Sequence, residues 1–415
     1  MEKQPVLKIG VFGDPQGLAS RHDWGMRNFA LALDIFREKN TDLLLSMGDT
    51  AEFGNPDTYA LYWQMIEERF GKNGVLHFAC EGNHDLEYRD PDFAFVFANA
   101  CKGLRRPAEL IYHEKISGYD FVAFAEDQRG KCKHSDESCE KLERFLETLS
   151  KDKPVFLLSH HPPADTMAGS HGKEGVKKLR EVLNKFPNVI ALSGHTHWPL
   201  ADETAIWQGE FSAVTTSTLA YACMGDKPCA NNMGGLIPYA REGVNILYME
   251  LFEDRLEIER IHVLDNAPIG EKWSIALPYK PENAVYTASR SRSFPVPEFP
   301  EDAEFLIRYD FGYWYFAVTR PEITAQYFEV EIQPLSFEGE MIFQRYIGDF
   351  HRMKENRSSM LFFKLPGAGI RSDEDYKIKV YPVNCFGVRG KPLEMTEHSW
   401  KYYKFKEEGI LCPQE

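Results

Sequence analysis

Positive charge is scarce in this chain of 415 residues, because lysine and arginine together number 48 against 63 aspartates and glutamates. The formal net charge is therefore −15 at pH 7. A protein of that charge repels the phosphate backbone of nucleic acids, so we expect no nucleic-acid partner. A small anionic phosphate ester can still bind such a protein where metal ions supply local positive charge.

Long apolar runs and closely spaced cysteines are lacking as well. No run of about 18 apolar residues occurs, and the first ten residues, MEKQPVLKIG, have no apolar signal-peptide core. The eight cysteines are scattered and form no CxxC pair, which is typical of thiols in a reducing compartment. We therefore expect no membrane association and a cytoplasmic location as written, or an extracytoplasmic one if a leader was trimmed. Oligomeric state is left open.

The pattern along the chain predicts two domains, as the length also favours. Residues 1–265 alternate short apolar runs with amphipathic stretches, which is typical of a layered α/β domain. Three later runs have no helix between them and predict antiparallel additions to the sheet. The predicted strands are residues 6–12, 42–47, 74–80, 119–125, 153–159 and 188–193, the helices include 24–40 and 139–151, and the antiparallel additions are 210–218, 243–251 and 255–263.

Two further regions follow this domain. Residues 266–299 are rich in proline and have little periodicity, so they are interpreted as a linker. Residues 300–415 contain six or seven short β-type runs separated by turn residues, which predicts a small all-β sandwich domain.

Five short motifs contain the candidate functional residues. Each follows a predicted strand, and loops at the carboxyl ends of parallel strands meet at one edge of a sheet. Aspartate, asparagine and histidine are ligands for divalent cations. The sequence therefore predicts a metal site. The motifs are GDPQ with Asp14 and Gln16, GDTAE with Asp49, GNHD with Asn83, His84 and Asp85, SHHPP with His160 and His161, and GHTH with His195 and His197.

The order and residue types of these motifs resemble the calcineurin-like metallophosphoesterase superfamily over about residues 6–264. The resemblance implies a four-layer α/β/β/α sandwich and two divalent metal ions, with Mn, Fe, Zn and Mg as the candidates. It also implies hydrolysis of a phosphate ester, and we favour a small phosphodiester or phosphomonoester because the sequence shows no basic face for nucleic acid. The implied ligands are Asp14, Gln16 and His197 for the first metal, Asn83, His160 and His195 for the second, and Asp49 as the bridge between both.

The resemblance also assigns catalytic roles. His84 would stand beside the scissile phosphate as general acid, oriented by Asp85, because an alkoxide is otherwise a poor leaving group. Within the SHHPP motif we favour His160 as the ligand over His161, although the spacing alone leaves the choice open.

Gln16 departs from the family pattern, which usually has histidine at that position. An amide oxygen is a weaker ligand than imidazole, so we expect a looser first metal site biased toward oxygen-preferring ions. The GDPQ form looks like a recurring variant, and the intact His84 favours a working enzyme. The alternative is a catalytically weakened binding protein with the same fold.

Four residues near the motifs are weaker candidates for substrate contacts: Arg21, Arg89, His161 and Trp198. Arg21 and Arg89 are included because a guanidinium can hold a phosphate through two hydrogen bonds. In the last region, residues 375–392 resemble the F and G strands of a fibronectin type III domain, with Tyr376 as the tyrosine-corner residue. A protein that binds a partner or a glycan through this sandwich is a third possibility.

Overall fold

A computed structural model describes residues 4–87, 90, 92–127, 134–172, 174–225, 228–232, 234–310, 313–335, 339–365 and 375–397. The chain forms two compact units. The first comprises Met1–Lys227, Met233–Ser293 and His351–Asn356, and the second comprises Pro228–Asn232, Phe294–Phe350 and Arg357–Glu415. The main change of unit therefore falls at residue 293, so most of the segment expected to be a linker belongs to the first unit.

The first sheet of the first unit is built around β1, which pairs in parallel with β2 and in antiparallel with β10. The expected antiparallel additions are confirmed for β10 and β11. The strand order is β12-β11-β10-β1-β2-β3, with β13 also paired to β11. The bounds are Leu7–Phe12 for β1, Leu43–Ser46 for β2, Leu76–Ala79 for β3, Asn245–Leu251 for β10, Arg255–His262 for β11, Ala267–Pro268 for β12 and Trp273–Ala276 for β13.

The second sheet of this unit has the order β4-β5-β6-β7-β9-β8. Here the expectation for residues 210–218 was wrong, because β9 joins β7 in parallel and only its other edge pairs antiparallel, with β8. The bounds are Ile111–Ile116 for β4, Tyr119–Phe124 for β5, Val155–Leu158 for β6, Val189–Ser193 for β7, Ile206–Gln208 for β8 and Ser212–Thr215 for β9.

The helices begin where local sequence caps them. The Asp23 side chain accepts a hydrogen bond from the Met26 N–H at the start of α1, and Asn55 with Pro56 begins α2. The helices are α1 Trp24–Glu38, α2 Pro56–Phe70, α3 Phe93–Gly103, α4 Asp136–Leu146 and α5 Lys177–Leu183, and the short 3₁₀ turns are η1 Glu52–Gly54, η2 Glu203–Ala205, η3 Ala240–Glu242, η4 Pro281–Asn283, η5 Ala288–Arg292 and η6 Lys354–Asn356.

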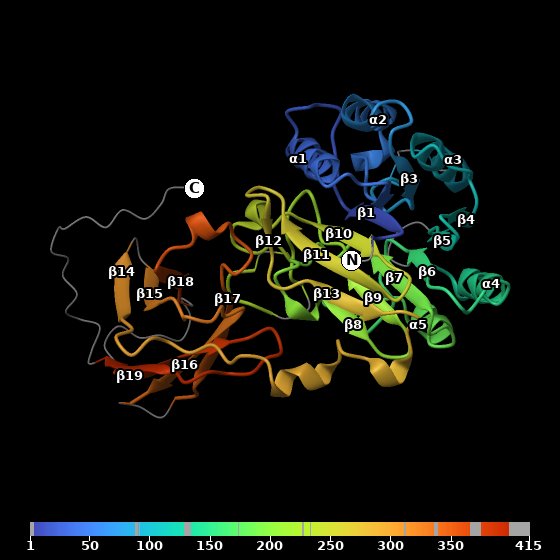
Figure 1. Cartoon of the computed structure of the whole chain (residues 1–415). Helices are drawn as coiled ribbons and strands as arrows, with labels where there is room; N and C mark the ends of the chain where they lie inside the picture. The colour runs from blue at the N-terminus through green and yellow to red at the C-terminus, as the bar shows by residue number, and fades with distance from the viewer. Residues whose placement is uncertain are drawn as a thin grey trace. The chain divides into compact units, whose positions relative to one another are not determined.

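Burial shows how the layers stack. Ile9 and Val11 of β1 lie in an apolar core together with Phe121 of β5 and Phe156 of β6, so the two sheets pack face to face. Phe12 lies in a different core with residues of α1 and α2, which cover the outer face of the first sheet (Figure 1). A third core joins α4 and α5 to the outer face of the second sheet. The predicted α/β/β/α sandwich is confirmed.

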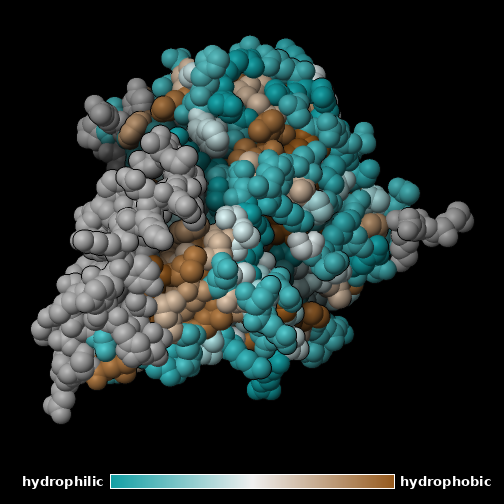
Figure 2. Space-filling view, turned by 90° about the vertical axis from the view of Figure 1, so that its left-hand side faces the viewer, coloured by the Kyte–Doolittle hydropathy of each residue, from teal (hydrophilic) through white to brown (hydrophobic). Residues whose placement is uncertain are grey.

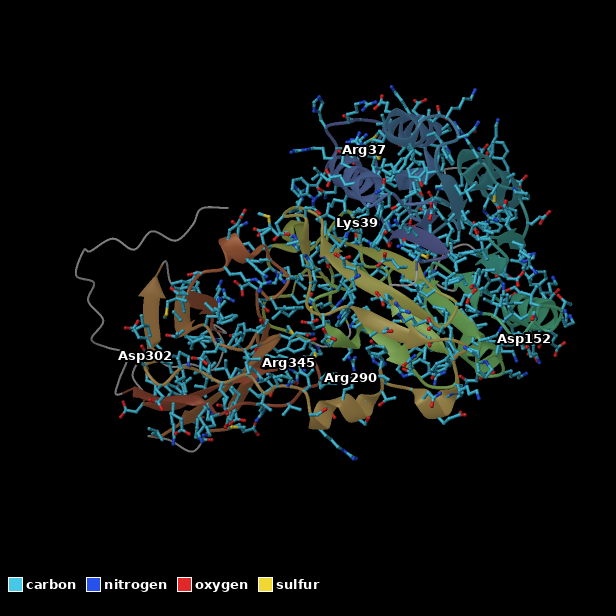
Figure 3. The ribbon with its side chains drawn as sticks, viewed as in Figure 1. Arg37, Lys39, Asp152, Arg290, Asp302 and Arg345 are labelled. Atoms are coloured by element: carbon cyan, nitrogen blue, oxygen red, sulfur yellow. The ribbon has the colours of Figure 1, made fainter. Side chains whose placement is uncertain are left out.

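Close approach of α1 to the sheet depends on Gly10, because a Cβ atom there would lie 2.7 Å from the Phe36 ring. The end of the same helix is fixed by Lys39, whose ammonium group forms an ion pair of 3.0 Å with Glu259 of β11 (Figure 3). The C-terminal end of the helix that follows the GDPQ loop is therefore held against the first sheet.

The second unit is a sandwich of two antiparallel sheets with the strand orders β14-β15-β18 and β17-β16-β19-β20. Phe316, Phe328 and Tyr376 lie in the apolar core that both sheets contribute to. The bounds are Phe305–Asp310 for β14, Tyr313–Thr319 for β15, Tyr327–Pro334 for β16, Ile342–Ile347 for β17, Met360–Lys364 for β18, Tyr376–Val383 for β19 and Leu393–Glu397 for β20.

The surface is largely hydrophilic on the face drawn in Figure 2, with scattered apolar patches. Large apolar side chains that remain exposed include Leu18 and Phe53. Within the described ranges, no helix combines the length and the apolar character that crossing a membrane requires. Cys80, Cys101 and Cys139 are buried thiols that form no disulfide.

Candidate metal centre

The five predicted motifs meet in the first unit, each in the loop that follows its strand. Three of these loops, GDPQ, GDTAE and GHTH, have an unusual backbone, because residues other than glycine have positive φ angles there. The values are 52° at Asp14, 44° at Gln16, 51° at Asp49, 66° at His195 and 51° at His197. Non-glycine residues rarely adopt this conformation, and it is concentrated at functional sites. The strained backbone turns each of these side chains out of its strand direction.

The first group of ligand atoms contains Asp14, Asp49 and His197, whose candidate atoms lie within 4.8 Å of one another. His197 Nε2 lies 3.2 Å from Asp14 Oδ1. All three side chains are almost completely buried. The other ring nitrogen of His197, Nδ1, donates to the Tyr221 carbonyl at 2.7 Å, which fixes the ring with Nε2 facing the carboxylates.

The second group surrounds the side-chain oxygen of Asn83, which lies 3.2 Å from His160 Nε2 and 3.0 Å from His195 Nδ1. Asp49 Oδ2 is 3.3 Å from the same His160 nitrogen, so Asp49 belongs to both groups. His160 Nδ1 faces the Met47 carbonyl at 2.7 Å, and His195 Nε2 faces Glu174 at 2.8 Å.

His160 and His161 are distinguished by these contacts. A nitrogen of His161 also comes within 4.8 Å of His160 and His195. However, His161 Nδ1 faces Glu126 at 2.5 Å, and its ring lies on that of His195 with centroids 3.7 Å apart. Of the two, His160 is the residue whose Nε2 reaches both Asn83 and Asp49, whereas His161 contacts Glu126 and the His195 ring.

The side chains fit a pair of cations. His160 and His197 each have Nδ1 on a backbone carbonyl, so in the neutral ring the lone pair of Nε2 points at a carboxylate oxygen. Two lone pairs facing each other repel unless a cation lies between them. Ligand atoms about 2.1 Å from one ion lie about 3.0–3.4 Å apart at ordinary coordination angles, which is the spacing found here.

The pKa values of the buried groups show that the carboxylates of the centre stabilise positive charge at this position. Burial raises the pKa of the Asp49 carboxyl, but attraction to His160 outweighs it and holds this pKa well below its usual range. Burial likewise lowers the pKa of His160, and the carboxylates of Asp49 and Asp14 raise it well above the usual value. Burial lowers the pKa of His195, so its ring is neutral and can act as a ligand.

His84 faces the group from one side, with Nε2 3.9 Å from Asp49 Oδ2. Its Nδ1 lies 3.1 Å from Glu52 and 3.6 Å from Glu87. Burial lowers the pKa of His84, but the Glu52 hydrogen bond and the nearby carboxylates raise it to about 9. The ring is therefore oriented by Glu52, three residues after Asp49, and the expectation that Asp85 orients it is corrected.

Asp85 instead joins two of the site loops. Its buried carboxylate accepts hydrogen bonds from the backbone N–H groups of Thr50, Ala51 and Gly82 at 2.9–3.2 Å and from the Tyr59 hydroxyl at 2.7 Å. Burial, with the charge of Asp49, raises the pKa of Asp85 to about 6. Its role is to hold the GDTAE and GNHD loops together.

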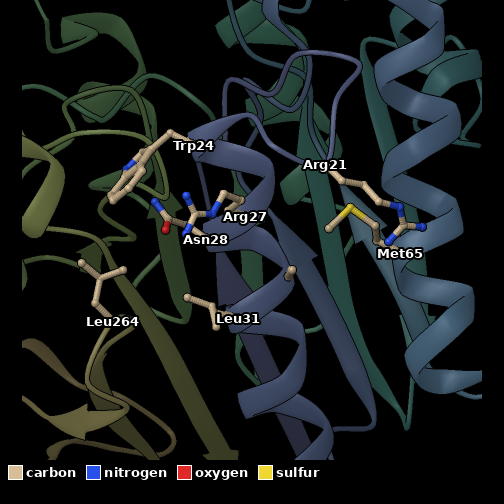
Figure 4. Close-up of a pocket in the computed structure, with 8 residues that line it drawn as sticks. Arg21, Trp24, Arg27, Asn28, Leu31, Met65 and Leu264 are labelled. Carbon is tan, nitrogen blue, oxygen red and sulfur yellow. The ribbon is translucent and has the colours of Figure 1, made fainter.

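The side chains that were expected from sequence to contact the substrate mostly have other partners. The Arg21 guanidinium forms a 2.6 Å ion pair with Glu68, and Figure 4 shows its side chain running toward α2 beside Met65. The Trp198 indole is buried and donates to Asp202 at 2.8 Å. In the structure both side chains are therefore paired with carboxylates. Arg89 lies outside the described residues.

Gln16 lies at the first group of ligands, with its backbone N–H on the Asp49 carbonyl at 2.8 Å. Sequence reasoning missed Tyr221 together with Glu126 and Glu174, which are distant in sequence from the motifs they support. Glu52 carried a signal, because it belongs to the GDTAE motif.

Comparison with known proteins agrees with this geometry. Residues 7–199 match the calcineurin-like phosphoesterase family. This part of the chain is therefore similar to a calcineurin-like phosphoesterase domain, and it has a mixed α/β fold like that of the family. A probable cyclic nucleotide phosphodiesterase of Synechococcus sp. is 25% identical over 197 residues, which are 46% of this chain and 71% of that protein.

Two solved structures are similar at low sequence identity. GAP50, described as the anchor in the inner membrane complex of Plasmodium, is 12% identical over 71% of this chain and 98% of its own, with a TM-score of 0.47. A purple acid phosphatase from yellow lupin (Lupinus luteus) is 15% identical over 66% of this chain and 54% of its own, also with a TM-score of 0.47.

Proposed function

We propose that this protein hydrolyses phosphate esters with the help of two divalent metal ions. The observation that supports this most is the shared position of Asp49, which lies in both groups of ligand atoms while His84 faces it from one side. A carboxylate common to two cation positions is the arrangement that a dinuclear hydrolytic centre needs.

The proposed ligands follow the two groups. Two divalent ions held there would acidify a shared water molecule and neutralise phosphoryl oxygens. Asn83 contributes an oxygen without adding negative charge, so the site remains able to accept an anion. Mn, Fe, Zn and Mg remain the candidate ions, and the Gln16 oxygen favours Mn and Mg at the first position. The first position is formed by Asp14, Gln16, Asp49 and His197, and the second by Asp49, Asn83, His160 and His195.

His84 supplies the proton for the leaving group. Its Nδ1–H donates to the Glu52 carboxylate, so Nε2 faces Asp49 and the reacting phosphate. A proton on Nε2 can then pass to the departing alkoxide oxygen. Glu52 fixes the orientation of the ring and stabilises its charged form, while Asp85 fixes the loop on which His84 stands.

The substrate we propose is a small phosphodiester or phosphomonoester. The cyanobacterial relative is named as a probable cyclic nucleotide phosphodiesterase, and this favours the diester.

The test is hydrolysis of bis-p-nitrophenyl phosphate and p-nitrophenyl phosphate by metal-stripped protein, after return of Mn²⁺, Mg²⁺, Zn²⁺ or Fe²⁺. We expect turnover that depends on the metal, with a higher kcat/KM for the diester. Absence of turnover with every ion, in protein that binds fewer than two ions, would favour the weakened binding protein instead.

A variant of the proposed acid separates catalysis from metal binding. His84→Ala should abolish turnover while the bound metal, measured by elemental analysis, stays at the wild-type level. The matched control is His171→Ala, because His171 is an exposed histidine of the same unit paired with the exposed Asp165. Loss of metal from the His84 variant alone would show that His84 is a ligand rather than an acid.

For the second unit, we infer a fibronectin type III-like module. The support is its strand order, with β14-β15-β18 in one sheet and β17-β16-β19-β20 in the other, and the burial of Tyr376 at the start of β19. If Tyr376 is a tyrosine-corner residue, Tyr376→Phe should lower the free energy of unfolding of this unit by about 1 kcal/mol, because the hydrogen bond that defines such a corner is lost. An unchanged denaturation midpoint would contradict the tyrosine-corner role.

A further inference from the structure

A cavity of about 300 Å³ lies along α1, the helix that follows the GDPQ loop (Figure 4). Its wall includes Trp24, Arg27 and Leu31 of α1 and Leu264, which follows β11. Among the described residues that line it there is no aspartate or glutamate. In a protein with a formal net charge of −15, a cavity with this lining is suited to an anion rather than a cation.

Two guanidinium groups approach the Trp24 indole from different elements. Cζ of Arg27 lies 5.7 Å from the ring centroid, and Cζ of Arg241, which belongs to η3, lies 5.8 Å from it. Both arginine side chains are exposed, and within the described ranges neither forms an ion pair with a carboxylate. Two cations held at one ring create a local positive potential, which an anion from solution would neutralise.

The acidic residues closest to these arginines in sequence have other partners. The Asp23 carboxylate accepts a hydrogen bond from the Met26 N–H at 3.2 Å, as the N-cap of α1. Glu242, which follows Arg241, forms an ion pair of 2.9 Å with Arg352. Both guanidinium groups at the indole therefore remain available to a ligand, and a guanidinium matches the geometry of phosphate oxygens.

The apolar part of the wall lies next to the charged part. Leu31, one helical turn after Arg27, is 43% exposed although its side chain is apolar. Figure 4 shows Leu264 on the same side of α1 as Trp24, facing Leu31. An exposed apolar surface beside an arginine without a carboxylate partner fits a ligand that has both a charged group and an apolar body.

We propose that this cavity binds a small organic anion, in which a phosphate or phosphonate group is attached to an apolar or aromatic body. The anionic oxygens accept hydrogen bonds from the Arg27 guanidinium, and Arg241 adds electrostatic attraction. The body of the ligand contacts Leu31 and Leu264. Neither the proposed metal ligands nor His84 is among the described residues that line the cavity, so the site requires no metal ion and goes beyond the proposed hydrolysis.

The experiment titrates full-length protein with phenylphosphonate by calorimetry, once with Mn²⁺ and once with excess EDTA. Phenylphosphonate has an anionic group on an aromatic ring and no ester bond to hydrolyse. We expect binding in both buffers. Arg27→Gln should lower the affinity in EDTA about 10- to 100-fold, the range expected for loss of hydrogen bonds to a charged oxygen. The matched control is Arg37→Gln in the last turn of α1, which makes the same charge change outside the cavity and should bind as wild type does.

Two further variants test the other parts of the site. Arg241→Gln should lower the affinity about 2- to 5-fold, because a charge several ångströms away in water contributes less than a direct hydrogen bond. Leu31→Ser should lower the affinity for phenylphosphonate about 3- to 10-fold and leave that for methylphosphonate unchanged, because only the aromatic body loses a contact. Circular dichroism confirms that each variant is folded.

Three results would overturn the inference. These are absence of phenylphosphonate binding in EDTA, equal affinity of Arg27→Gln and wild type, and an equal loss of affinity in Arg27→Gln and Arg37→Gln, which would indicate general attraction to positive charge. Failure of the proposed function is a separate result, because it appears as absent ester turnover with Mn²⁺, and the titration in EDTA does not depend on turnover.

Discussion

Replacement of Asp85 separates the structural role assigned here from the catalytic role expected from sequence. In Asp85→Asn, the amide oxygen can accept from only some of the present donors, and the new NH₂ group faces N–H groups of the GDTAE and GNHD loops. Two lost hydrogen bonds to a charged acceptor are worth about 1.5–3 kcal/mol each, and removal of the carboxylate charge beside Asp49 returns part of that. We expect the free energy of unfolding to fall by about 3 kcal/mol.

The assay is urea denaturation followed by circular dichroism, with metal affinity measured by competition against a chelating dye. Asp152→Asn is the matched control, because Asp152 is exposed and should change stability by less than about 0.5 kcal/mol. Metal affinity should fall together with stability in the Asp85 variant, since both loops carry ligands. The reasoning is refuted if stability and metal content stay at the wild-type level while kcat falls 100-fold or more, the result that direct action on His84 would give.

Three further variants test other parts of the site and its support. Glu52→Gln should move the alkaline limb of the kcat/KM profile down by about one pH unit, because the pKa of His84 falls from about 9 once the carboxylate charge is gone; an unmoved limb would contradict this. Gln16→Ala should leave fewer than two ions bound after buffer exchange, as measured by elemental analysis, and retention of both would exclude Gln16 as a ligand. Burial lowers the pKa of His77 to about 3, and its ring contacts the Tyr62 hydroxyl. Below pH 6.5 His77 therefore binds a proton in the unfolded state and stays neutral in the folded state. The free energy of unfolding should be about 1–2 kcal/mol lower at pH 5 than at pH 7. This slope should flatten in His77→Gln, and an equal slope in both proteins would contradict the assignment.

The ligand loops could be predicted because their geometry is local. Each motif follows a strand, and neighbouring parallel strands bring their carboxyl ends to one edge. Asp14 after β1 and Asp49 after β2 are therefore adjacent for the same reason that β1 and β2 pair. The four-layer stacking follows from the alternation in β1, where Val11 faces the second sheet and Phe12 faces α1.

The supporting contacts could not be predicted in the same way. The turn at Glu52–Gly54 determines that the Glu52 carboxylate reaches His84. The Asp85 carboxylate accepts hydrogen bonds from backbone N–H groups instead. Arg21 forms an ion pair with Glu68 on α2, a helix that begins 35 residues later in the chain. No local sequence pattern predicts this contact.

The pairing of β13 with β11 was not predicted from the sequence, because local pattern gives little signal there too. Residues 266–299 have many prolines, yet Trp273 and Ile275 alternate with exposed neighbours and extend the core between the sheets. A four-residue alternation is too short to predict a strand within a proline-rich segment. The parallel pairing of β9 depends on β8 forming the outer edge, and only the folded sheet determines that.

Three histidines of the site share one arrangement that bears on the weak ligand Gln16. His195 faces Glu174, His161 faces Glu126 and His84 faces Glu52, each through one ring nitrogen. A carboxylate on the far nitrogen makes a ligating imidazole more basic and fixes the nitrogen that faces the metal. Only the second metal position gains from this, through His195, because His197 is held by a neutral carbonyl. The two positions should therefore differ in affinity, with the ion beside Gln16 the first to leave on titration with a chelator.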